Sequence, residues 1–576
     1  MMRNYKEEYQ RWLDSPALSE TEWEELNSIA DDEKEIESRF FAPLEFGTAG
    51  LRGTMKLGLH QMNVHVIRHA TQAFANVIKA EGAQAMEKGI AICFDCRNNS
   101  ELFAHEAACV MAANGIHVRI FDALRPTPEL SFAVRYYGTT AGLNITASHN
   151  PKEYNGYKVY WSDGAQLPPQ HAEAIAEQMS KIDIFNDFVT CDFENALSSG
   201  KIELIGAETD EAYLEQVLGQ AINKSVVAKV APEFKIVYTP FHGAGYKLVP
   251  EALYRLGITQ LFPVPEQMVI DGNFPTVESP NPENPEGFYL AVDLAKEVGS
   301  DLIIGTDPDS DRIGVMVRSG DGYKTITGNQ LGVLLLDYVI TARKAAGTLP
   351  ENAGAVKSIV TTEMAKAVAE ANGVHFEDTF TGFKFMAERI AQWESAGSYK
   401  YIFAYEESYG YMMGDYVRDK DAVTASMMVA EMAAYYYDKG MNLSQAMESL
   451  YEKYGRYAEK TLNLVMPGLD GIVKMKNLMA DLRSNPPRKI ADVEVFRIRD
   501  YSDGSITVPA LGVVGNTPIK GSNVLYFELA DGTSFIVRPS GTEPKVKVYI
   551  LCKGQDKTEC DSKIAKYSEY AESLRK

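Results

Sequence analysis

Residues 301–312 read Asp-Leu-Ile-Ile-Gly-Thr-Asp-Pro-Asp-Ser-Asp-Arg, and they decide the fold of this chain. The first half is an apolar run that is typical of a strand buried on both faces of a parallel sheet. The second half is a tight acidic loop at the carboxyl end of that strand, where α/β folds place their ligand sites. The stretch therefore predicts an α/β domain with a functional loop at the edge of its sheet.

The same pattern returns along most of the chain. Strand-like runs occur at residues 89–94, 117–121, 235–238, 301–305, 358–361 and 401–404. Helical patterns lie between them, for example at residues 101–114 and 285–298. Alternation of strands and helices indicates parallel α/β sheets.

The two ends of the chain differ from this middle part. In the first forty residues, the apolar spacing around Trp12 and Trp23 predicts two short helices packed on a larger body. Near the carboxyl end, alternating runs predict a small antiparallel sheet with helices on one face; they lie at residues 495–498, 524–527 and 545–550. We predict four domains: residues 1–205, 206–320, 321–455 and 456–576.

The composition excludes several classes of protein. The chain has 576 residues and a formal net charge of -22, which argues against a nucleic-acid partner because phosphate backbones bind clustered Lys and Arg. A few cations in one cleft still suffice for a small phosphorylated ligand, since a distant negative surface is screened beyond about 10 Å. No apolar run has the roughly 18 residues of a membrane span, and the amino terminus lacks the apolar segment of a signal peptide. We therefore expect a cytoplasmic protein without a membrane partner.

The six cysteines are sparse for this length. Cys93 and Cys96 form a C-x-x-C, but a zinc site of this type normally has a second pair. Buried thiols in a reducing compartment are the more ordinary interpretation.

Three carboxylates alternate in the acidic loop at Asp307, Asp309 and Asp311. They repel one another unless a cation is present, and hard oxygen ligands suit magnesium or calcium. An EF-hand would need Gly at the sixth position and Glu at the twelfth, where this chain has Arg312 and Arg318. The remaining alternatives are a cation site and an exposed acidic turn, and the apolar strand before the loop favours the cation site.

A second loop contains Ser148 in the run Thr-Ala-Ser-His-Asn-Pro, residues 146–151. Small neighbours leave the hydroxyl accessible, and the Asn-Pro pair prevents a helix from running on. His149 and Lys158 can both be cationic and can bracket an anion on the serine. A polar surface turn is the alternative for a lone Ser-His pair. A nucleophile elbow of the G-x-S-x-G type is missing, so acyl transfer is disfavoured.

Four further loops have the composition of phosphate or sugar sites, although such turns are common one by one. They are residues 46–53 (FGTAGLRG), 381–384 (TGFK), 405–410 (YEESYG) and 537–545 (VRPSGTEPK). In the last of these, which we call the phosphate loop, hydroxyls, free backbone N–H groups and a guanidinium can surround a phosphate. The acidic pair in the YEESYG loop suits sugar hydroxyls.

Taken together, these motifs resemble the α-D-phosphohexomutase superfamily in its phosphoglucomutase branch. TASHNP, DPDSDR, EESYG and RPSGTEPK occur in the family's order over nearly the whole chain, and residues 274–287 (FPTVESPNPENPEG) resemble the bacterial branch that includes phosphopentomutases. The resemblance implies four domains around a central cleft: three related α/β domains with mixed sheets and a C-terminal α+β domain of TATA-binding-protein-like fold.

The resemblance also implies roles for individual residues. Ser148 is expected to carry a phosphate and to bind one Mg²⁺ together with Asp307, Asp309 and Asp311. The residues expected near the reacting groups are Arg52, His149, Lys158 and Arg312. The residues expected to bind substrate are Thr381, Lys384, Glu406, Ser408, Arg538, Ser540, Gly541, Thr542 and Lys545.

The activity implied is interconversion of glucose 1-phosphate and glucose 6-phosphate through glucose 1,6-bisphosphate, by a monomer or homodimer. Some relatives carry His where this chain has Gly410, and pentose-specific relatives often have Ala where it has Ser408. The departure at Gly410 favours the glucose branch and leaves the general base open, and Ser408 favours a hexose over a pentose. The alternatives are a phosphopentomutase, a phosphomannomutase, a bisphosphate synthase of the same fold, a magnesium-dependent sugar phosphatase and a silent phosphosugar-binding protein.

Overall fold

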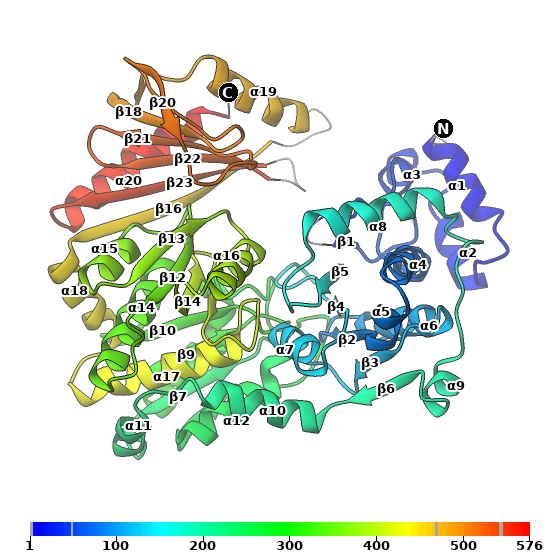
Figure 1. Ribbon diagram of the computed structural model, residues 1–576, viewed down its shortest axis with the longest axis horizontal. Helices are drawn as coiled ribbons and strands as arrows, with labels where there is room; N and C mark the ends of the chain where they lie inside the picture. Colours follow the sequence, from blue (N-terminus) through cyan, green and yellow to red (C-terminus); the bar gives the residue numbers. More distant parts are fainter. Residues whose placement is uncertain (1–3, 48–49, 467–470, 541–544, 576) are drawn as a thin grey trace. The chain divides into compact units, whose positions relative to one another are not determined.

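The computed structural model describes residues 4–47, 50–466, 471–540 and 545–575. The chain has two compact units, and Figure 1 labels their helices and strands. The first contains Met1–Thr327 and Ser408–Asn442, and the second contains Gly328–Glu407 and Leu443–Lys576. None of the described helices combines the length and apolarity that a membrane span requires.

The first unit begins with a six-stranded sheet in the order β1-β5-β4-β2-β3-β6. The strands are β1 (Leu51–Thr54), β2 (Ile90–Phe94), β3 (Val118–Phe121), β4 (Ala141–Ile145), β5 (Tyr154–Trp161) and β6 (Ile202–Ile205). Strands β4, β2, β3 and β6 are parallel, whereas β5 is antiparallel to β4 and β1. This mixed sheet places the chain after β4 beside the start of β5.

Helices cover both faces of that sheet. They are α1 (Tyr5–Leu13), α2 (Glu20–Asn27), α3 (Glu33–Phe40), α4 (Val64–Ala80), α5 (Ala83–Lys88), α6 (Ser100–Ala113), α7 (Thr127–Tyr137), α8 (Pro169–Lys181) and α9 (Phe193–Ser198). In β2, Ile90 and Ile92 face a large core with α4, α6 and α8, while Ala91 and Cys93 face α7. Successive side chains alternate between the two faces because the strand is pleated.

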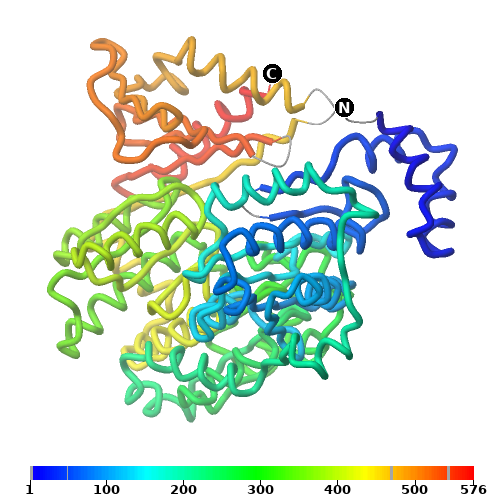
Figure 2. Tube along the Cα trace, turned by 45° about the vertical axis from the view of Figure 1, so that its right-hand side comes forward, coloured from blue at the N-terminus to red at the C-terminus, as the bar shows by residue number. Residues whose placement is uncertain are grey.

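The second sheet of this unit has the order β11-β10-β9-β7-β8. Its strands are β7 (Lys235–Thr239), β8 (Gln260–Pro263), β9 (Leu302–Thr306), β10 (Ile313–Ser319) and β11 (Gly322–Ile326). The helices are α10 (Ala207–Leu218), α11 (Lys224–Val230), α12 (Gly245–Leu256), η1 (Pro285–Phe288) and α13 (Tyr289–Val298). The segment Ser408–Asn442, which also belongs to this unit, forms β15 (Gly410–Met412) and α17 (Ala422–Asp438). Helix α17, the yellow tube in Figure 2, packs beside α11 and α12.

The second unit combines an α/β part with an antiparallel sheet. In the α/β part, β12 (Ala353–Ser358) is parallel to β13 (His375–Thr379) and β14 (Lys400–Glu406). Its helices are α14 (Gly328–Ala345), α15 (Met364–Ala371), α16 (Phe383–Ala396) and α18 (Leu443–Tyr454).

The antiparallel sheet runs β16-β23-β22-β21-β18-β19-β20, and β17 pairs with β18. Its elements are β16 (Arg456–Val465), α19 (Gly471–Ser484), β17 (Lys489–Ile490), β18 (Val493–Asp500), β19 (Ser505–Val508), β20 (Gly512–Asn516), β21 (Leu525–Leu529), β22 (Ser534–Pro539), β23 (Lys545–Gly554) and α20 (Lys557–Ser573). Helices α19 and α20 cover one face through a core around Phe527 and Tyr567. The other face packs on the α/β part through Phe380, Tyr526 and Tyr549.

Most sequence expectations about secondary structure are confirmed, but two are wrong. The first forty residues form three helices, because Ile36 and Phe40 on α3 add a further buried face. The strand expected at 358–361 is β12, Ala353–Ser358, with a turn after it. Its small residues make a weak strand signal, but a Cβ at Gly354 would lie 2.7 Å from Trp393, so the packing requires them.

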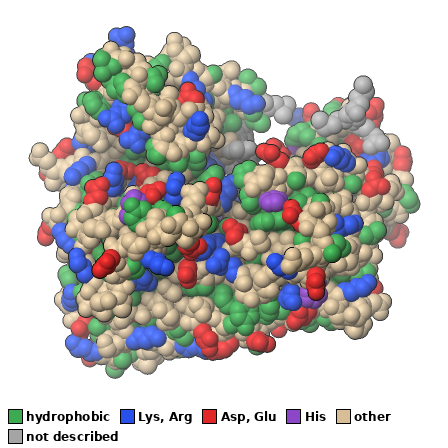
Figure 3. Space-filling view, viewed as in Figure 1, with side chains coloured by type: hydrophobic (Ala, Val, Ile, Leu, Met, Phe, Trp, Pro, Cys, Tyr) green, Lys and Arg blue, Asp and Glu red, His purple; other side chains and the backbone are tan. Residues whose placement is uncertain are grey.

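Charges of both signs are interleaved on the surface. On the face drawn in Figure 3, Lys and Arg side chains alternate with Asp and Glu over each unit. On that face, the excess negative charge of the chain is therefore not gathered in one patch.

Candidate active site

The metal loop, residues 307–312, connects β9 with the antiparallel strand β10. The Oδ1 atom of Asp307 accepts hydrogen bonds of 3.0 Å from the backbone N–H groups of Asp311 and Arg312. The N–H of Ser310 donates to the carbonyl of Asp307 at 2.9 Å, and Ser310 has a left-handed backbone with φ of 52°. The loop is thus closed by hydrogen bonds to the backbone and the side chain of Asp307, and its three carboxylates are fully or almost fully buried.

Each of the three carboxylates offers a ligand atom within 4.8 Å of the others. Among the described residues, this is the only such group of three or more metal-ligating side chains. Burial and the charges of Asp309 and Asp311 raise the pKa of Asp307 well above its usual value. Burial would also raise the pKa of Asp309, but Lys158 and Thr127 outweigh it and lower that pKa. The cluster is therefore short of positive charge at Asp307.

The donor set fits a divalent cation. Asp309 Oδ1 and Asp311 Oδ1 are buried, and neither accepts a hydrogen bond from any residue that the structure describes. Asp311 Oδ1 forms a long ion pair of 3.8 Å with Arg312 Nε. A buried carboxylate oxygen without a hydrogen bond is costly unless a cation binds it closely. Oxygen ligands of this kind suit Mg²⁺. The C-x-x-C at Cys93 and Cys96, in contrast, consists of buried free thiols.

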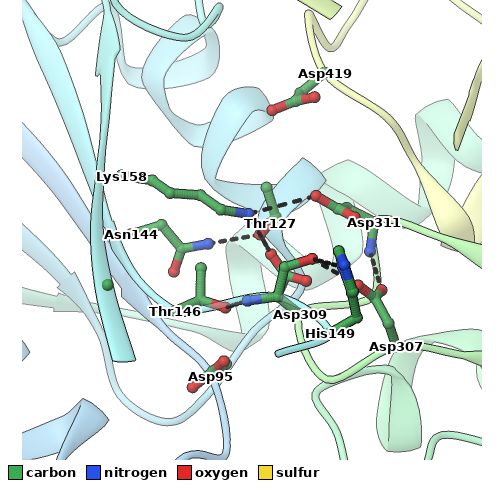
Figure 4. A network of polar contacts seen from close by, with 12 residues as sticks. Asp95, Thr127, Asn144, Thr146, His149, Lys158, Asp307, Asp309, Asp311 and Asp419 are labelled. Carbon is green, nitrogen blue, oxygen red and sulfur yellow. Dashed lines mark hydrogen bonds and ion pairs between the residues drawn. The ribbon is translucent and has the colours of Figure 1, made fainter. Parts of the chain in front are cut away.

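The serine loop, residues 146–151, follows β4 and brings Ser148 to the metal loop. Its Oγ donates to Asp307 Oδ2 at 2.9 Å and lies 3.2 Å from His149 Nδ1. Ser148 is 3% exposed and has a left-handed φ of 53°. The nucleophile candidate, its neighbouring base candidate and the carboxylates therefore form one cluster (Figure 4).

Cations surround this cluster from several elements. Lys158 on β5 donates to Asp309 Oδ2 at 2.7 Å and lies 3.5 Å from Asp311 Oδ2. Burial would lower the pKa of Lys158, but Asp309 and Asp311 raise it above its usual value. Arg52 on β1 donates to the side chain of Asn150 at 3.1 Å, and the Arg312 guanidinium reaches Glu283 at 3.1 Å. All four predicted cation-capable residues, His149 included, lie on or beside the two loops.

Two residues that contact the carboxylate cluster were not predicted from the sequence. Thr127, at the start of α7, donates its hydroxyl to Asp309 Oδ2 at 2.7 Å and its N–H to the Asp309 carbonyl at 2.8 Å. Asn144 on β4 donates to the same threonine hydroxyl at 2.6 Å (Figure 4). Both are isolated polar residues at the ends of elements, and no local pattern marks them.

A third missed residue is Lys420, which lies 3.2 Å from Asp311 Oδ2. Asp419 holds its ammonium at 3.0 Å and accepts a hydrogen bond from Tyr160 on β5. The run of charges at residues 418–421, directly before the apolar helix α17, is the signal that could have found it.

The remaining predicted residues belong to other loops of the chain. Ser408 is in the turn after β14 and belongs to the first unit, whereas Glu406 belongs to the second. Glu406 is 6% exposed and accepts from the N–H of Gly382 at 2.5 Å. Thr381 has a buried hydroxyl without a hydrogen-bond partner among the described residues, and Lys384 lies over the Phe385 ring.

The phosphate loop after β22 belongs to the same unit as Glu406. The Ser540 N–H donates to the Lys545 carbonyl at 2.8 Å, and Arg538 pairs with Lys547 across β22 and β23. Burial and the charge of Glu407 raise the pKa of Tyr549, which Arg538 also contacts. The charge of Glu406 also raises the pKa of Tyr549. Gly541 and Thr542 lie outside the described residues.

The sequence matches four domain families in the order of this arrangement. They are described as Phosphoglucomutase/phosphomannomutase alpha/beta/alpha domain I (residues 43–185), domain II (211–320), domain III (327–454) and the C-terminal domain (485–560). The chain belongs to the phosphoglucomutase/phosphomannomutase family. It is therefore an enzyme of the intramolecular phosphotransferase class, built from the family's four domains.

Relatives within this family cover almost all of the chain. It is 36% identical over 540 residues to a phosphoglucomutase of Staphylococcus aureus strain MRSA252, covering 93% of this chain and 94% of that one. It is 35% identical to the phosphoglucomutase of Staphylococcus saprophyticus, covering 90% and 92%.

Solved structures share the fold. The open form of pp63/parafusin, a phosphoglucomutase from Paramecium, matches with a TM-score of 0.67 at 18% identity, over 93% of this chain and 95% of that one. A phosphoglucomutase/phosphomannomutase family protein from Burkholderia thailandensis matches with a TM-score of 0.65 at 19% identity, over 92% and 97%.

Proposed function

We propose that the chain interconverts glucose 1-phosphate and glucose 6-phosphate, with Ser148 as the phosphate carrier. One observation carries the proposal: Ser148 Oγ lies 2.9 Å from Asp307 Oδ2, inside a buried cluster of three carboxylates ringed by cations. Several relatives at 35–36% identity are named phosphoglucomutase, which supports glucose as the sugar.

The proposed cycle has two phosphoryl transfers. Phosphorylated Ser148 donates its phosphoryl group to the free hydroxyl of the sugar monophosphate, and glucose 1,6-bisphosphate results. The bisphosphate turns over, and its other phosphate returns to Ser148. Catalysis of such transfers comes mainly from positioning and charge stabilisation. Lys158, Lys420, Arg52 and Arg312 supply the positive charge.

Charge balance explains why so many cations are needed. A phosphoserine adds roughly -1.5 to -2 charges beside the three carboxylates. When Mg²⁺ is bound, held by Asp307, Asp309, Asp311 and the phosphate on Ser148, it supplies Lewis-acid stabilisation of the charge that develops on the phosphoryl oxygens. Lys158 Nζ, at 2.7 Å from Asp309, offsets part of the remainder.

His149 is the proposed proton acceptor when Ser148 takes up phosphate. Its Nδ1 lies 3.2 Å from Ser148 Oγ, within the reach that general acid–base catalysis requires. Lys158 is already bonded to Asp309 and serves better as a fixed positive charge.

The substrate's other end is assigned to two loops. Glu406 and Ser408 would accept hydrogen bonds from sugar hydroxyls. The phosphate that does not react would bind the loop of Arg538, Ser540, Gly541 and Thr542, with Lys545 beside it. Thr381 and Lys384 would orient the sugar; the buried, unpartnered Thr381 hydroxyl supports such a role.

A coupled assay tests the choice of sugar. Glucose 1-phosphate, mannose 1-phosphate and ribose 1-phosphate are compared with Mg²⁺ and a trace of glucose 1,6-bisphosphate. We expect the highest kcat/KM with glucose 1-phosphate. A preference for mannose 1-phosphate or ribose 1-phosphate would make the chain a phosphomannomutase or phosphopentomutase, and net release of inorganic phosphate would make it a sugar phosphatase. A cytoplasmic location and a monomer or homodimer belong to the same proposal.

A further inference from the structure

Arg97 contacts the serine loop more extensively than any residue discussed so far. It lies just after β2, and its side chain is fully buried. One terminal nitrogen, Nη2, donates to the carbonyls of Ser148 and Asn150, each at 2.5 Å. The other, Nη1, donates to the carbonyls of Pro151 and Tyr154 at 2.9 and 3.0 Å. A single guanidinium therefore donates hydrogen bonds to four backbone carbonyls between Ser148 and Tyr154.

The backbone of Ser148 needs such support. A non-glycine residue in the left-handed region costs roughly 1–2 kcal/mol, and such strain persists only where the surroundings over-determine it. The Thr146 hydroxyl accepts from the N–H of Ser148 at 2.8 Å, and Arg97 binds its carbonyl. Both peptide groups around the serine are thus held, and the side chain is directed at Asp307.

Only an arginine can make this set of contacts. Its planar fork carries five N–H donors in fixed directions, whereas a lysine ammonium has three on a flexible stem. The Nε side of the fork faces Asp95 Oδ2 at 3.3 Å, and Asp95 Oδ1 accepts from Ser100 and from the Arg97 backbone. The contact between Nε and Oδ2 is an ion pair and not a hydrogen bond, so Asp95 supports the guanidinium through its charge.

An aromatic ring packs on the same guanidinium. The Phe274 ring centroid lies 5.2 Å from the central carbon of the Arg97 guanidinium, and Phe274 is 3% exposed. Phe274 begins the Pro-rich segment 274–287 that resembles the bacterial branch. With Pro151, it also lines a pocket of about 590 Å³ between this segment and the end of the serine loop. Segment 274–287 is thus linked to Ser148 through Arg97, which contacts both.

We propose that Arg97 is a positioning residue for phosphoryl transfer: its guanidinium, packed against Phe274, holds the serine loop so that Ser148 presents its oxygen to the metal loop. The inference rests on the proposed role of Ser148 as phosphate carrier. Among the described residues, the Arg97 side chain donates hydrogen bonds to backbone carbonyls and not to the Ser148 hydroxyl, so it is equally available to the loop with and without a phosphate on the serine. Loss of the fork lowers the rate of transfer and leaves substrate binding nearly unchanged.

The test is Arg97→Lys, which keeps the charge and removes the fork. Because a misplacement of about 1 Å can cost roughly 100-fold in rate, we expect kcat to fall by about 30- to 100-fold and KM for glucose 1-phosphate to change by less than about 3-fold. Single-turnover transfer from the phosphorylated enzyme to glucose 6-phosphate should slow by the same factor.

Arg39→Lys is the matched control. Arg39 is also buried, and it binds Glu25, Glu35 and the Leu57 carbonyl near the N-terminal helices. We expect this variant to lose stability with kcat unchanged. If Arg97→Lys does not fold, Phe274→Leu replaces it, and we expect about a 3- to 10-fold fall in kcat without a change in KM.

The outcomes separate the two hypotheses. Intact mass of the wild type and of Ser148→Ala, each after incubation with glucose 1,6-bisphosphate, shows whether Ser148 carries phosphate. No phosphate on the wild type, or an equal phosphorylated fraction in both, would refute the proposed carrier. If the wild type is phosphorylated and Arg97→Lys, or Phe274→Leu in its place, turns over at the wild-type rate, the positioning role is refuted. An equal fall of kcat in Arg39→Lys would also refute it, since the effect would then follow from stability alone.

Discussion

The serine loop and the metal loop solve the same geometric problem in different ways. Each places a serine in the left-handed region, Ser148 at φ of 53° and Ser310 at φ of 52°. The metal loop is closed by hydrogen bonds between its own residues, three to five positions apart. Three carbonyls of the serine loop are held by Arg97, which is 51 to 54 positions away. The two serines also differ in use, because Ser148 Oγ binds Asp307, whereas Ser310 Oγ is buried without a hydrogen-bond partner among the described residues.

Each loop has both internal and external hydrogen bonds. The difference is that the turn of the metal loop is made mainly by local bonds to Asp307, whereas several carbonyls of the serine loop are gathered by one distant side chain. A loop closed mainly by local bonds tolerates changes in its surroundings as long as those bonds persist. A loop held from outside transmits changes in distant residues directly to its nucleophile. The predictions below test this division, from the largest expected effect to the smallest.

Ser148→Ala should abolish turnover. Without the hydroxyl there is no phosphate carrier, and removal of a nucleophile commonly costs roughly 10⁴-fold or more. The coupled assay measures the loss, and intact mass should show that the phosphorylated species has disappeared. Ser310→Ala is the matched control, with near wild-type activity and an unchanged phosphorylated fraction. Substantial turnover by Ser148→Ala would place the carrier elsewhere.

Thr127→Val should weaken metal binding by about 10- to 100-fold, the usual cost of losing a residue that orients a ligand. The threonine hydroxyl occupies Asp309 Oδ2 and leaves Oδ1 for the cation. Titration calorimetry with Mg²⁺, or Mn²⁺ followed by electron paramagnetic resonance, measures the affinity directly. Thr127→Ser keeps the hydroxyl and should bind almost as the wild type does. Equal affinities of the Val and Ser variants would show that the metal loop needs no external support.

His149 should make stability depend on pH. Burial, with Arg312 and Arg52 nearby, holds its pKa well below 6.5 in the unphosphorylated protein. Below about pH 6.5 the unfolded chain takes up a proton that folded His149 does not, so stability falls as the pH falls, by about 1.4 kcal/mol per pH unit.

Urea denaturation of the metal-free protein at pH 7 and pH 5.5 measures this dependence. His149→Gln should lose less stability than the wild type over the same interval, while His171→Gln, at a histidine stacked on Trp161, should behave as the wild type. If the wild type lost less free energy of unfolding than His149→Gln between pH 7 and pH 5.5, His149 would not be buried as a neutral ring.

Ser310→Gly should have the smallest effect. Glycine adopts a positive φ without the cost that a Cβ imposes, and no described hydrogen bond of the hydroxyl is lost, so we expect a gain of up to about 1 kcal/mol in the free energy of unfolding. Activity should stay near that of the wild type. A loss of more than about 1 kcal/mol would show that the metal loop depends on its serine side chain, as the serine loop does.

Much of the candidate site was predictable because its motifs are continuous. The strand at 302–306 and its three aspartates follow one another directly, so periodicity and residue type were sufficient. The structure places Ser148, His149, Lys158 and Asp307 together as expected, although their roles stay predictions. Thr127, Lys420 and Arg97 were missed because each acts across 51 or more positions on a residue of another element.

The sequence by itself determined the family, the four-domain α/β plan and the two loops that carry the chemistry, because these depend on short runs of residue types. Only the tertiary structure decided how Ser148 is held. Its left-handed backbone, the four carbonyls on Arg97, and the one oxygen of Asp309 left free by Thr127 and Lys158 all depend on distances between segments far apart in the chain. The physical reason is that a buried charge or a strained peptide is stable only where all its hydrogen-bond and ion-pair partners are in place. These partners come from distant segments, so no local sequence pattern predicts them.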